Sequence, residues 1–160
     1  QMSFGTGHHE TTFMMVETMR TIDLNKKKVL DMGTGTGILA ILSKKMGAEY
    51  VEAIDISGDA IHNCIENASN NNVDLVTKLG EKEQIDKKNY DVILANINRN
   101  ILLNQMVLYS EKLKKGGNLL LSGFLSEDEE KIIISANKND LHLSQKKNKE
   151  NWLCLAFIKK

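Results

Sequence analysis

The chain alternates between short apolar runs and longer segments in which apolar residues recur every three or four positions. The short runs have the length and the bounding turn residues of buried strands, and the longer segments have the period of amphipathic helices. This alternation predicts a parallel sheet whose strands are joined by crossover helices. The predicted parallel strands are Lys28–Met32, Tyr50–Ile56, Asp74–Leu79, Tyr90–Ala95 and Asn118–Ser122.

The segments between these strands carry helix signals. One helix is predicted over Ile38–Met46, with Gly47 as its stop, and a second is predicted to begin after the N-cap Ser57. A third is predicted to end at Gly116 and Gly117. The second helix is expected to bury Ile61, Cys64, Ile65 and Ala68, and the third to bury Leu102, Leu103, Met106, Val107, Ser110 and Leu113.

The C-terminal part of the chain has a different pattern. After Ser126 a polar-rich helix is predicted to reach Lys138, followed by strands over Leu141–Gln145 and Trp152–Ile158. The linker 146–151 is too short for a crossover helix, so these two strands are predicted to pair antiparallel. The expected fold is a single α/β domain over residues 1–160, with a doubly wound, mostly parallel seven-stranded sheet that ends in an antiparallel hairpin. This Rossmann-like arrangement is typical of class I methyltransferases.

Composition narrows the class of partner. The chain has 21 Lys and Arg and 21 Asp and Glu, so its formal net charge is zero and gives no electrostatic footprint for nucleic acid. No apolar run is long enough to span a bilayer, so no membrane partner is expected. Cys64 and Cys154 lie in different predicted elements and form no C-x-x-C pair. We expect free thiols, as in a reducing cytoplasm.

The first strand runs directly into a glycine-rich turn, Gly33-Thr34-Gly35-Thr36-Gly37, that opens onto a helix. Glycines let the backbone adopt φ > 0 and let a ligand approach the main chain. Dinucleotide-binding turns have the spacing G-x-G-x-x-G, whereas the spacing here is G-x-G-x-G, which is most often found around S-adenosylmethionine. The turn therefore predicts S-adenosylmethionine, with Gly33 and Gly35 in contact with it.

Asp55 and Asn96 end two of the predicted strands, and ligands of open α/β sheets bind at such strand ends. Asp55 is placed to accept both hydroxyls of an adenosine ribose, which suits NAD as well as S-adenosylmethionine; alternatively it makes a turn with Ser57. The amide oxygen of Asn96 is suited to accept a hydrogen bond from an attacking amine. The alternative is that Asn96 caps a turn before the next helix.

The segment around Thr12 bears on metal binding and on cofactor binding. His9-Glu10-Thr11-Thr12-Phe13 lacks the second histidine of the zinc pattern H-E-x-x-H, so no metal is expected. Thr11 and Thr12 are predicted to enter a helix whose start, with free N–H groups and a hydroxyl, suits the carboxylate of an amino acid. The same residues equally describe a capped helix after a glycine loop. That helix is expected to carry Met15, Val16 and Met19 on one side.

Three blocks of sequence resemble the ribosomal protein L11 methyltransferase family. They are F-G-T-G-x-H-x-T-T from Phe4, D-x-G-x-G-x-G-I-L-A-I from Asp31 and A-N-I from Ala95, and the likeness extends to Trp152. It implies a cytoplasmic enzyme that transfers methyl groups from S-adenosylmethionine to lysine side chains and an N-terminal α-amine of ribosomal protein L11. It implies cofactor binding by Phe4, Gly5, Thr6, Thr12, Gly33, Asp55, Glu81 and Asn96. We also expect Gly35 and Ile56 to bind the cofactor and Asn96 to be the catalytic residue.

The same resemblance raises the question of substrate recognition. Members of this family carry an N-terminal substrate-recognition domain, which we expect to be absent from these 160 residues. We therefore expect the chain to bind S-adenosylmethionine but to methylate the ribosomal protein poorly. Two other classes stay open, an NAD-dependent oxidoreductase and a binding module that has lost catalysis. A binding module would use five lysines near the hairpin as a ribosomal contact surface. The alternative is that these lysines form a solvated hairpin end. They are Lys146, Lys147, Lys149, Lys159 and Lys160.

Overall fold

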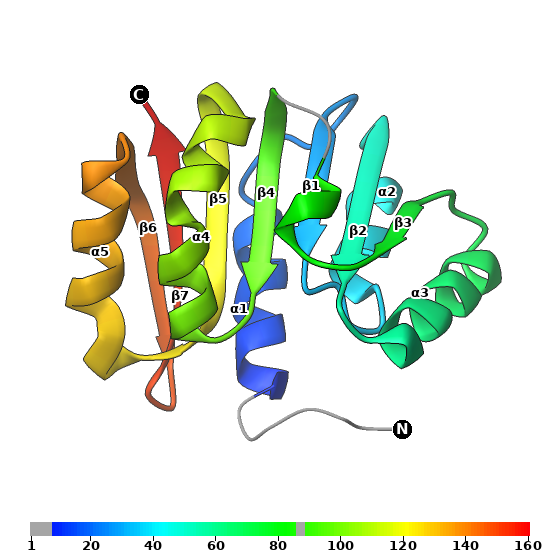
Figure 1. Ribbon diagram of the computed structural model, residues 1–160, viewed down its shortest axis with the longest axis horizontal. Helices are drawn as coiled ribbons and strands as arrows, with labels where there is room; N and C mark the ends of the chain where they lie inside the picture. The colour runs from blue at the N-terminus through cyan, green and yellow to red at the C-terminus, as the bar shows by residue number, and fades with distance from the viewer. Residues whose placement is uncertain (1–7, 86–88) are drawn as a thin grey trace.

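The computed structural model describes residues 8–85 and 89–160 (Figure 1). Within these residues the strands form one seven-stranded sheet of order β3-β2-β1-β4-β5-β7-β6. The parallel part consists of β1 (Lys28–Met32), β2 (Tyr50–Asp55), β3 (Val76–Leu79), β4 (Tyr90–Asn96) and β5 (Leu113–Leu125), and the antiparallel part adds β6 (Leu141–Lys149) and β7 (Trp152–Lys159).

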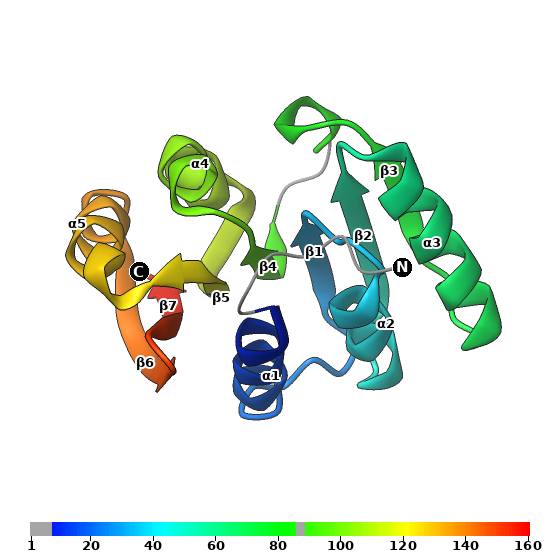
Figure 2. The same cartoon turned by 90° about the horizontal axis from the view of Figure 1, so that it is seen from below.

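Helices cover both faces of this sheet, which makes it doubly wound, as predicted. Figure 2 shows α4 and α5 on one side and α1 and α2 on the other. One hydrophobic core joins the sheet to α4 and α5, and a second joins it to α1, α2 and α3. The helices are α1 (His8–Met19), α2 (Ile38–Lys45), α3 (Gly58–Asn70), α4 (Arg99–Lys112) and α5 (Glu129–Lys138), with 3₁₀ turns η1 (Lys82–Gln84) and η2 (Ser126–Asp128).

The strand order positions the functional end of the sheet. β1 lies between β2 and β4, so the chain changes direction across the sheet at the β1–β4 pair. Open α/β sheets bind ligands beyond the carboxyl ends of the strands at such a switch point. The carboxyl ends of β1, β2 and β4 all lie along the lower edge of the sheet in Figure 1.

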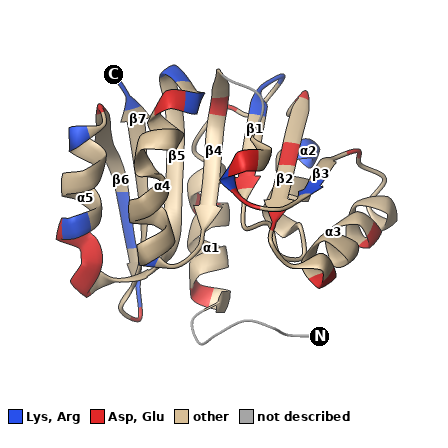
Figure 3. Ribbon diagram, viewed as in Figure 1, with Lys and Arg blue, Asp and Glu red and all other residues tan. Residues whose placement is uncertain are grey.

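The hairpin is antiparallel, as predicted, but its loop is shorter than the sequence suggested. β6 continues to Lys149, so only Glu150 and Asn151 form the turn, and both have positive φ, 48° and 73°. Two residues with positive φ are typical of the type I′ turn, whose twist matches that of the strands. Its lysines therefore belong largely to an edge strand, visible as the blue segments of β6 in Figure 3, where charge opposes pairing with another chain.

Two predicted helix faces are wrong in part. On α4, Val107 is 54% exposed, whereas Gln105 and Tyr109 are buried, because the face centred on Leu102 and Met106 continues through Tyr109. On α3, Ile65 is exposed and the buried stripe contains only Cys64 and Ala68. α3 covers the edge of the sheet at β3 and β2, so its apolar contact is narrow.

The predicted end of the third helix is also wrong. α4 stops at Lys112, and β5 begins at Leu113 rather than after Gly116 and Gly117. Leu113 pairs with Tyr90, and the register shifts before Val92, so β5 starts with an irregularity that takes in the two glycines. The helix is therefore shorter and the strand longer than the glycine stop predicted.

Two expectations from composition concern the cysteines and membrane-spanning segments. Cys64 and Cys154 are free thiols, both buried. No helix of the described residues is both long and apolar enough to cross a bilayer.

We expect Met106→Ala to lower the free energy of unfolding by about 2–5 kcal/mol, because Met106 is fully buried in the α4 core. Val107→Ala, one position along the same helix, should change it by less than about 0.5 kcal/mol. Urea unfolding of both variants tests this orientation of α4. Equal losses for the two variants would contradict it.

Candidate functional site

A cleft of about 960 Å³ opens at the carboxyl ends of β1, β2 and β4. Residues from α1, from the first turns of α4 and from the start of β7 complete its walls. Three of the predicted site residues, Phe4, Gly5 and Thr6, lie outside the described residues. The structure brings all the others together, since the cleft is lined by Thr12, Gly33, Gly35, Asp55, Ile56, Glu81 and Asn96.

The glycine turn folds tightly against the neighbouring strands. The amides of Gly33 and Thr34 both donate to the carbonyl oxygen of Ile54, at 2.8 and 3.0 Å. Gly33 has φ of +73°, and a Cβ at this position would lie 2.4 Å from Cγ2 of Ile97. Glycine is therefore required here both by the backbone conformation and by the close approach of the segment after β4.

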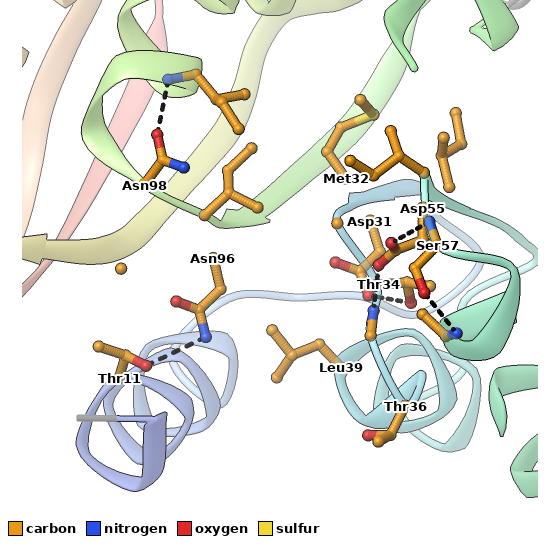
Figure 4. Close-up of a pocket in the computed structure, with 18 of the residues that line it drawn as sticks. Thr11, Asp31, Met32, Thr34, Thr36, Leu39, Asp55, Ser57, Asn96 and Asn98 are labelled. Carbon is orange, nitrogen blue, oxygen red and sulfur yellow. Dashed lines mark hydrogen bonds between the residues drawn. The ribbon is translucent and has the colours of Figure 1, made fainter. Parts of the chain in front are cut away.

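Asp55 is the last residue of β2 and accepts hydrogen bonds from two backbone amides. Its Oδ2 accepts from the amide of Gly35 at 2.8 Å, and its Oδ1 accepts from the amide of Ser57 at 3.0 Å (Figure 4). The turn with Ser57, which was the structural alternative, is thus present. It does not exclude a ligand, because each carboxylate oxygen retains a second lone pair for a hydroxyl donor.

Asp31 is a buried carboxyl group in the wall of the cleft. It is only 2% exposed and accepts a hydrogen bond of 2.7 Å from Oγ1 of Thr34. Burial raises the pKa of Asp31 to about 7, while hydrogen bonds from Thr34 and the amide of Ala40 act in the opposite direction. Sequence reasoning did not select Asp31 as a site residue, although its place two positions before Gly33 in D-x-G was a usable signal.

Asn96 is held by a side chain from α1. Its Nδ2 donates to Oγ1 of Thr11 at 3.3 Å (Figure 4). Thr11 in turn donates to the carbonyl oxygen of His8 at 3.1 Å. Asn98, not Asn96, caps α4, since its Oδ1 accepts from the amide of Ile101 at 3.1 Å. The capping alternative for Asn96 is therefore excluded, and its Oδ1 accepts from no described donor.

Thr12 lines the cleft from α1. Thr11 and Thr12 lie near the described start of that helix, His8, as predicted for a helix entered by the two threonines. The hydroxyl of Thr12 lies 3.4 Å from Nε2 of His8, which also lines the cleft. That the amides at this helix start bind a carboxylate stays a prediction.

A bulge in β5 completes the wall beside Asn96. The pairing of β5 with β7 shifts register between Ser122 and Phe124, around Gly123 with φ of +98°. A Cβ on Gly123 would lie 2.6 Å from the carbonyl oxygen of Ile97. β7 pairs alongside, which brings Trp152 to the cleft. No local sequence signal marked Gly123 or Trp152 for this role.

Charge is distributed unevenly in the cleft. Every carboxylate comes from the β1, β2 and β3 side, and of the described residues that line the cleft none is Lys or Arg. The α4 side presents neutral amides instead. The cleft therefore favours a ligand with positive charge over a phosphate. The carboxylates are Asp31, Asp55, Asp59 and Glu81, and the amides are Asn98, Asn100, Asn104 and Gln105.

The sequence matches a known family over its whole length. A family model described as ribosomal protein L11 methyltransferase matches residues 1–160. A protein of that name from Porphyromonas gingivalis is 48% identical over 159 residues, which cover 98% of this chain and 55% of the relative. One from Bacteroides fragilis is 41% identical, covering 99% and 57%. The chain thus spans little more than half the length of these curated relatives.

Solved structures agree in fold. The crystal structure of ribosomal protein L11 methylase from Lactobacillus delbrueckii subsp. bulgaricus has a TM-score of 0.91 and 31% identity, covering 96% of this chain and 81% of that one. Magnesium protoporphyrin IX methyltransferase from Synechocystis PCC 6803, solved with bound SAM, has a TM-score of 0.79 at 18% identity, covering 96% and 80%, and supports the fold alone. The predicted fold class is confirmed.

The burial of Asp31 has a consequence for stability. The pKa of Asp31 is about 7 in the folded chain against an ordinary value of 3.8, so between these values the folded state holds a proton that the unfolded state releases. Its contribution to stability is therefore greatest at acidic pH and is lost as the pH rises from about 4 to about 7. Urea unfolding of wild type and Asp31→Asn across that range tests this. The variant should gain stability relative to wild type as the pH rises, and a constant difference would contradict the assignment.

Proposed function

The chain belongs to the ribosomal protein L11 methyltransferase family, and from this premise we propose that it transfers methyl groups from S-adenosylmethionine to amino groups of ribosomal protein L11. The acceptors would be lysine side chains and the N-terminal α-amine. The cytoplasm would be the site of this activity. The observation that carries the proposal is a cleft at the switch point of the sheet, lined by the G-x-G-x-G turn and by four acidic residues.

The charge of the cleft favours this cofactor over NAD. S-adenosylmethionine carries a sulfonium and an ammonium group, whereas NAD carries a pyrophosphate. Asp55 lies beside the glycine turn, where a dinucleotide would place its phosphates, and no described Lys or Arg lines the cleft. A pyrophosphate there would face this carboxylate without a compensating cation. This counts against the oxidoreductase alternative.

The residues of the cleft fit the parts of this cofactor. Asp55 has lone pairs for the ribose hydroxyls, and the exposed side chain of Ile56 offers an apolar surface to the base. Glu81 would accept from the adenine amine. The hydroxyl of Thr12 lies on the α1 side, where it would meet the methionine part. We propose that Phe4, Gly5 and Thr6 also contact the cofactor.

Asn96 would position the methyl acceptor. When bound, the cofactor supplies a methyl group on a sulfonium leaving group, so the transfer needs placement rather than strong acid or base catalysis. The Oδ1 of Asn96 would accept an N–H of the neutral amine and direct its lone pair at the methyl carbon. Such in-line placement is worth roughly 7–11 kcal/mol in well-oriented systems. Thr11 supports this role because it engages the amide nitrogen of Asn96.

Recognition of the whole substrate is a separate question. The matched segment is 55–57% of the length of the first two curated relatives. We propose that residues 1–160 form the S-adenosylmethionine-dependent methyltransferase domain, and that recognition of L11 depends on an N-terminal domain of the family. On this view the 160-residue chain binds the cofactor well and methylates L11 slowly.

Isothermal titration with S-adenosylmethionine, S-adenosylhomocysteine and NAD tests the cofactor assignment. We expect both sulfur compounds to bind and NAD not to bind. Asp55→Ala should weaken S-adenosylmethionine by about 10- to 150-fold, the range for hydrogen bonds of a charged group. Asp74→Ala, on an exposed residue that does not line the cleft, is the control and should leave the Kd unchanged. Binding of NAD alone would overturn the proposal.

Replacement of Thr11 tests the positioning of Asn96. Thr11→Val keeps the shape but removes the oxygen that accepts from Asn96, so kcat for methylation of an amine should fall about three- to tenfold with little change in cofactor Kd. Thr11→Ser should restore most of the rate, since it retains the hydroxyl. Methyl transfer is followed with labelled cofactor at saturating concentration.

Thr18→Val is a matched control for Thr11→Val. Thr18 is also buried on α1 and donates to a backbone carbonyl, that of Met14 at 2.8 Å, but it does not line the cleft. It should lose a similar amount of stability without loss of kcat. If the two valine variants slowed transfer equally, the role assigned to Thr11 would be wrong.

A further inference from the structure

Gln105 is a buried amide on α4 with one end fixed. It is 7% exposed and lines the cleft. Its Oε1 accepts a hydrogen bond of 2.5 Å from the hydroxyl of Tyr109, which is fully buried. Burial raises the pKa of Tyr109, so this phenol stays protonated and acts as the donor. The orientation of the Gln105 amide therefore follows from its neighbour.

The other end of Gln105 carries two free donors. Among the described residues Nε2 has no hydrogen-bond acceptor, and this nitrogen is accessible to solvent. Because Gln105 lines the cleft, we take these N–H groups as available to a ligand there. They match an acceptor atom on that ligand.

Two exposed apolar side chains offer surfaces to a flat ring. Ile56, directly after β2, and Ile101, in the first turn of α4, both line the cleft and are both exposed. They come from different elements of its wall. A base lying between them would cover both surfaces, while its polar edge would remain to be matched by hydrogen bonds.

A hydrogen-bond acceptor borders the same region. Glu81 follows Gly80, whose amide donates to the carbonyl oxygen of Asp55 at 2.8 Å, so it lies next to the residue assigned to the ribose. Directly after it, Nζ of Lys82 donates to Oδ1 of Asn104 at 3.4 Å. This contact brings the start of η1 beside α4, immediately before Gln105. Glu81 and Gln105 are the sequence neighbours of the two residues in this contact, and both line the cleft.

We propose that Gln105 determines the specificity for the base of the cofactor, with its Nε2 donating to ring nitrogen N1 of adenine while Glu81 accepts from the exocyclic amine. This inference rests on the S-adenosylmethionine site proposed above. Adenine presents an amine donor beside a ring-nitrogen acceptor, which matches one acceptor and one donor. Hypoxanthine presents a carbonyl and an N–H at the same positions, so an acceptor would face an acceptor and a donor would face a donor, and both contacts would be lost.

A binding cycle with two ligands tests this contact. Wild type and Gln105→Met are titrated with S-adenosylhomocysteine and with its 1-deaza analogue, in which a C–H replaces N1. Wild type should bind the 1-deaza analogue about three- to tenfold more weakly, whereas Gln105→Met should bind the two ligands equally. The ratio is taken within one protein, so a partly unfolded variant does not affect it.

Two further variants sharpen the test. Tyr109→Phe keeps the ring but releases Oε1 of Gln105, so its discrimination between the two ligands should fall below that of wild type. Gln145→Met is the control, because Gln145 lies on β6, donates to Thr21 and does not line the cleft. It should keep the wild-type ratio.

The outcomes separate this inference from the function on which it rests. Equal binding of both ligands by wild type, or undiminished discrimination by Gln105→Met, would overturn the role of Gln105. Failure of wild type to bind S-adenosylhomocysteine at all would instead overturn the proposed function.

Discussion

Ile97 occupies a place that only glycine neighbours permit. A Cβ on Gly33 would collide with its side chain, and a Cβ on Gly123 would collide with its backbone. These two glycines belong to the loop after β1 and to the bulge in β5, on either side of β4. The segments that follow β1 and β4 and the bulge in β5 therefore meet at one residue, and Asn96, directly before it, is fixed in the wall of the cleft.

Different elements contribute different kinds of polar group to the cleft. The β1, β2 and β3 ends carry the carboxylates, while α4 and α1 contribute neutral polar groups. Two of these amides are oriented by a neighbouring hydroxyl: Nδ2 of Asn96 donates to Thr11, and Oε1 of Gln105 accepts from Tyr109. Each partner fixes one end of a polar group and leaves the other for a ligand, so the cleft is largely preorganised.

The sequence predicted the parts of this arrangement that depend on local chemistry. The bounds of β1, the Ser57 cap and the antiparallel hairpin are confirmed, because an apolar run, a capping hydroxyl and a short linker each restrict the chain locally. The roles of Gly123 and Trp152 depend on which strand pairs with β5, and the period of α4 did not distinguish Val107 from Tyr109. Such features are set by tertiary contacts, which no local pattern contains.

The position of β7 bears on how the domain assembles. It follows the other strands of the sheet in the chain, yet it lies between β5 and β6. During synthesis one edge of β5 therefore stays unpaired until β7, which follows α5 and β6 in the chain, has been made. Trp152 lines the cleft only after β7 has inserted beside β5. Pairing partners distant in sequence fold slowly. An incomplete chain would thus expose a sheet edge to other proteins before it had a finished binding site.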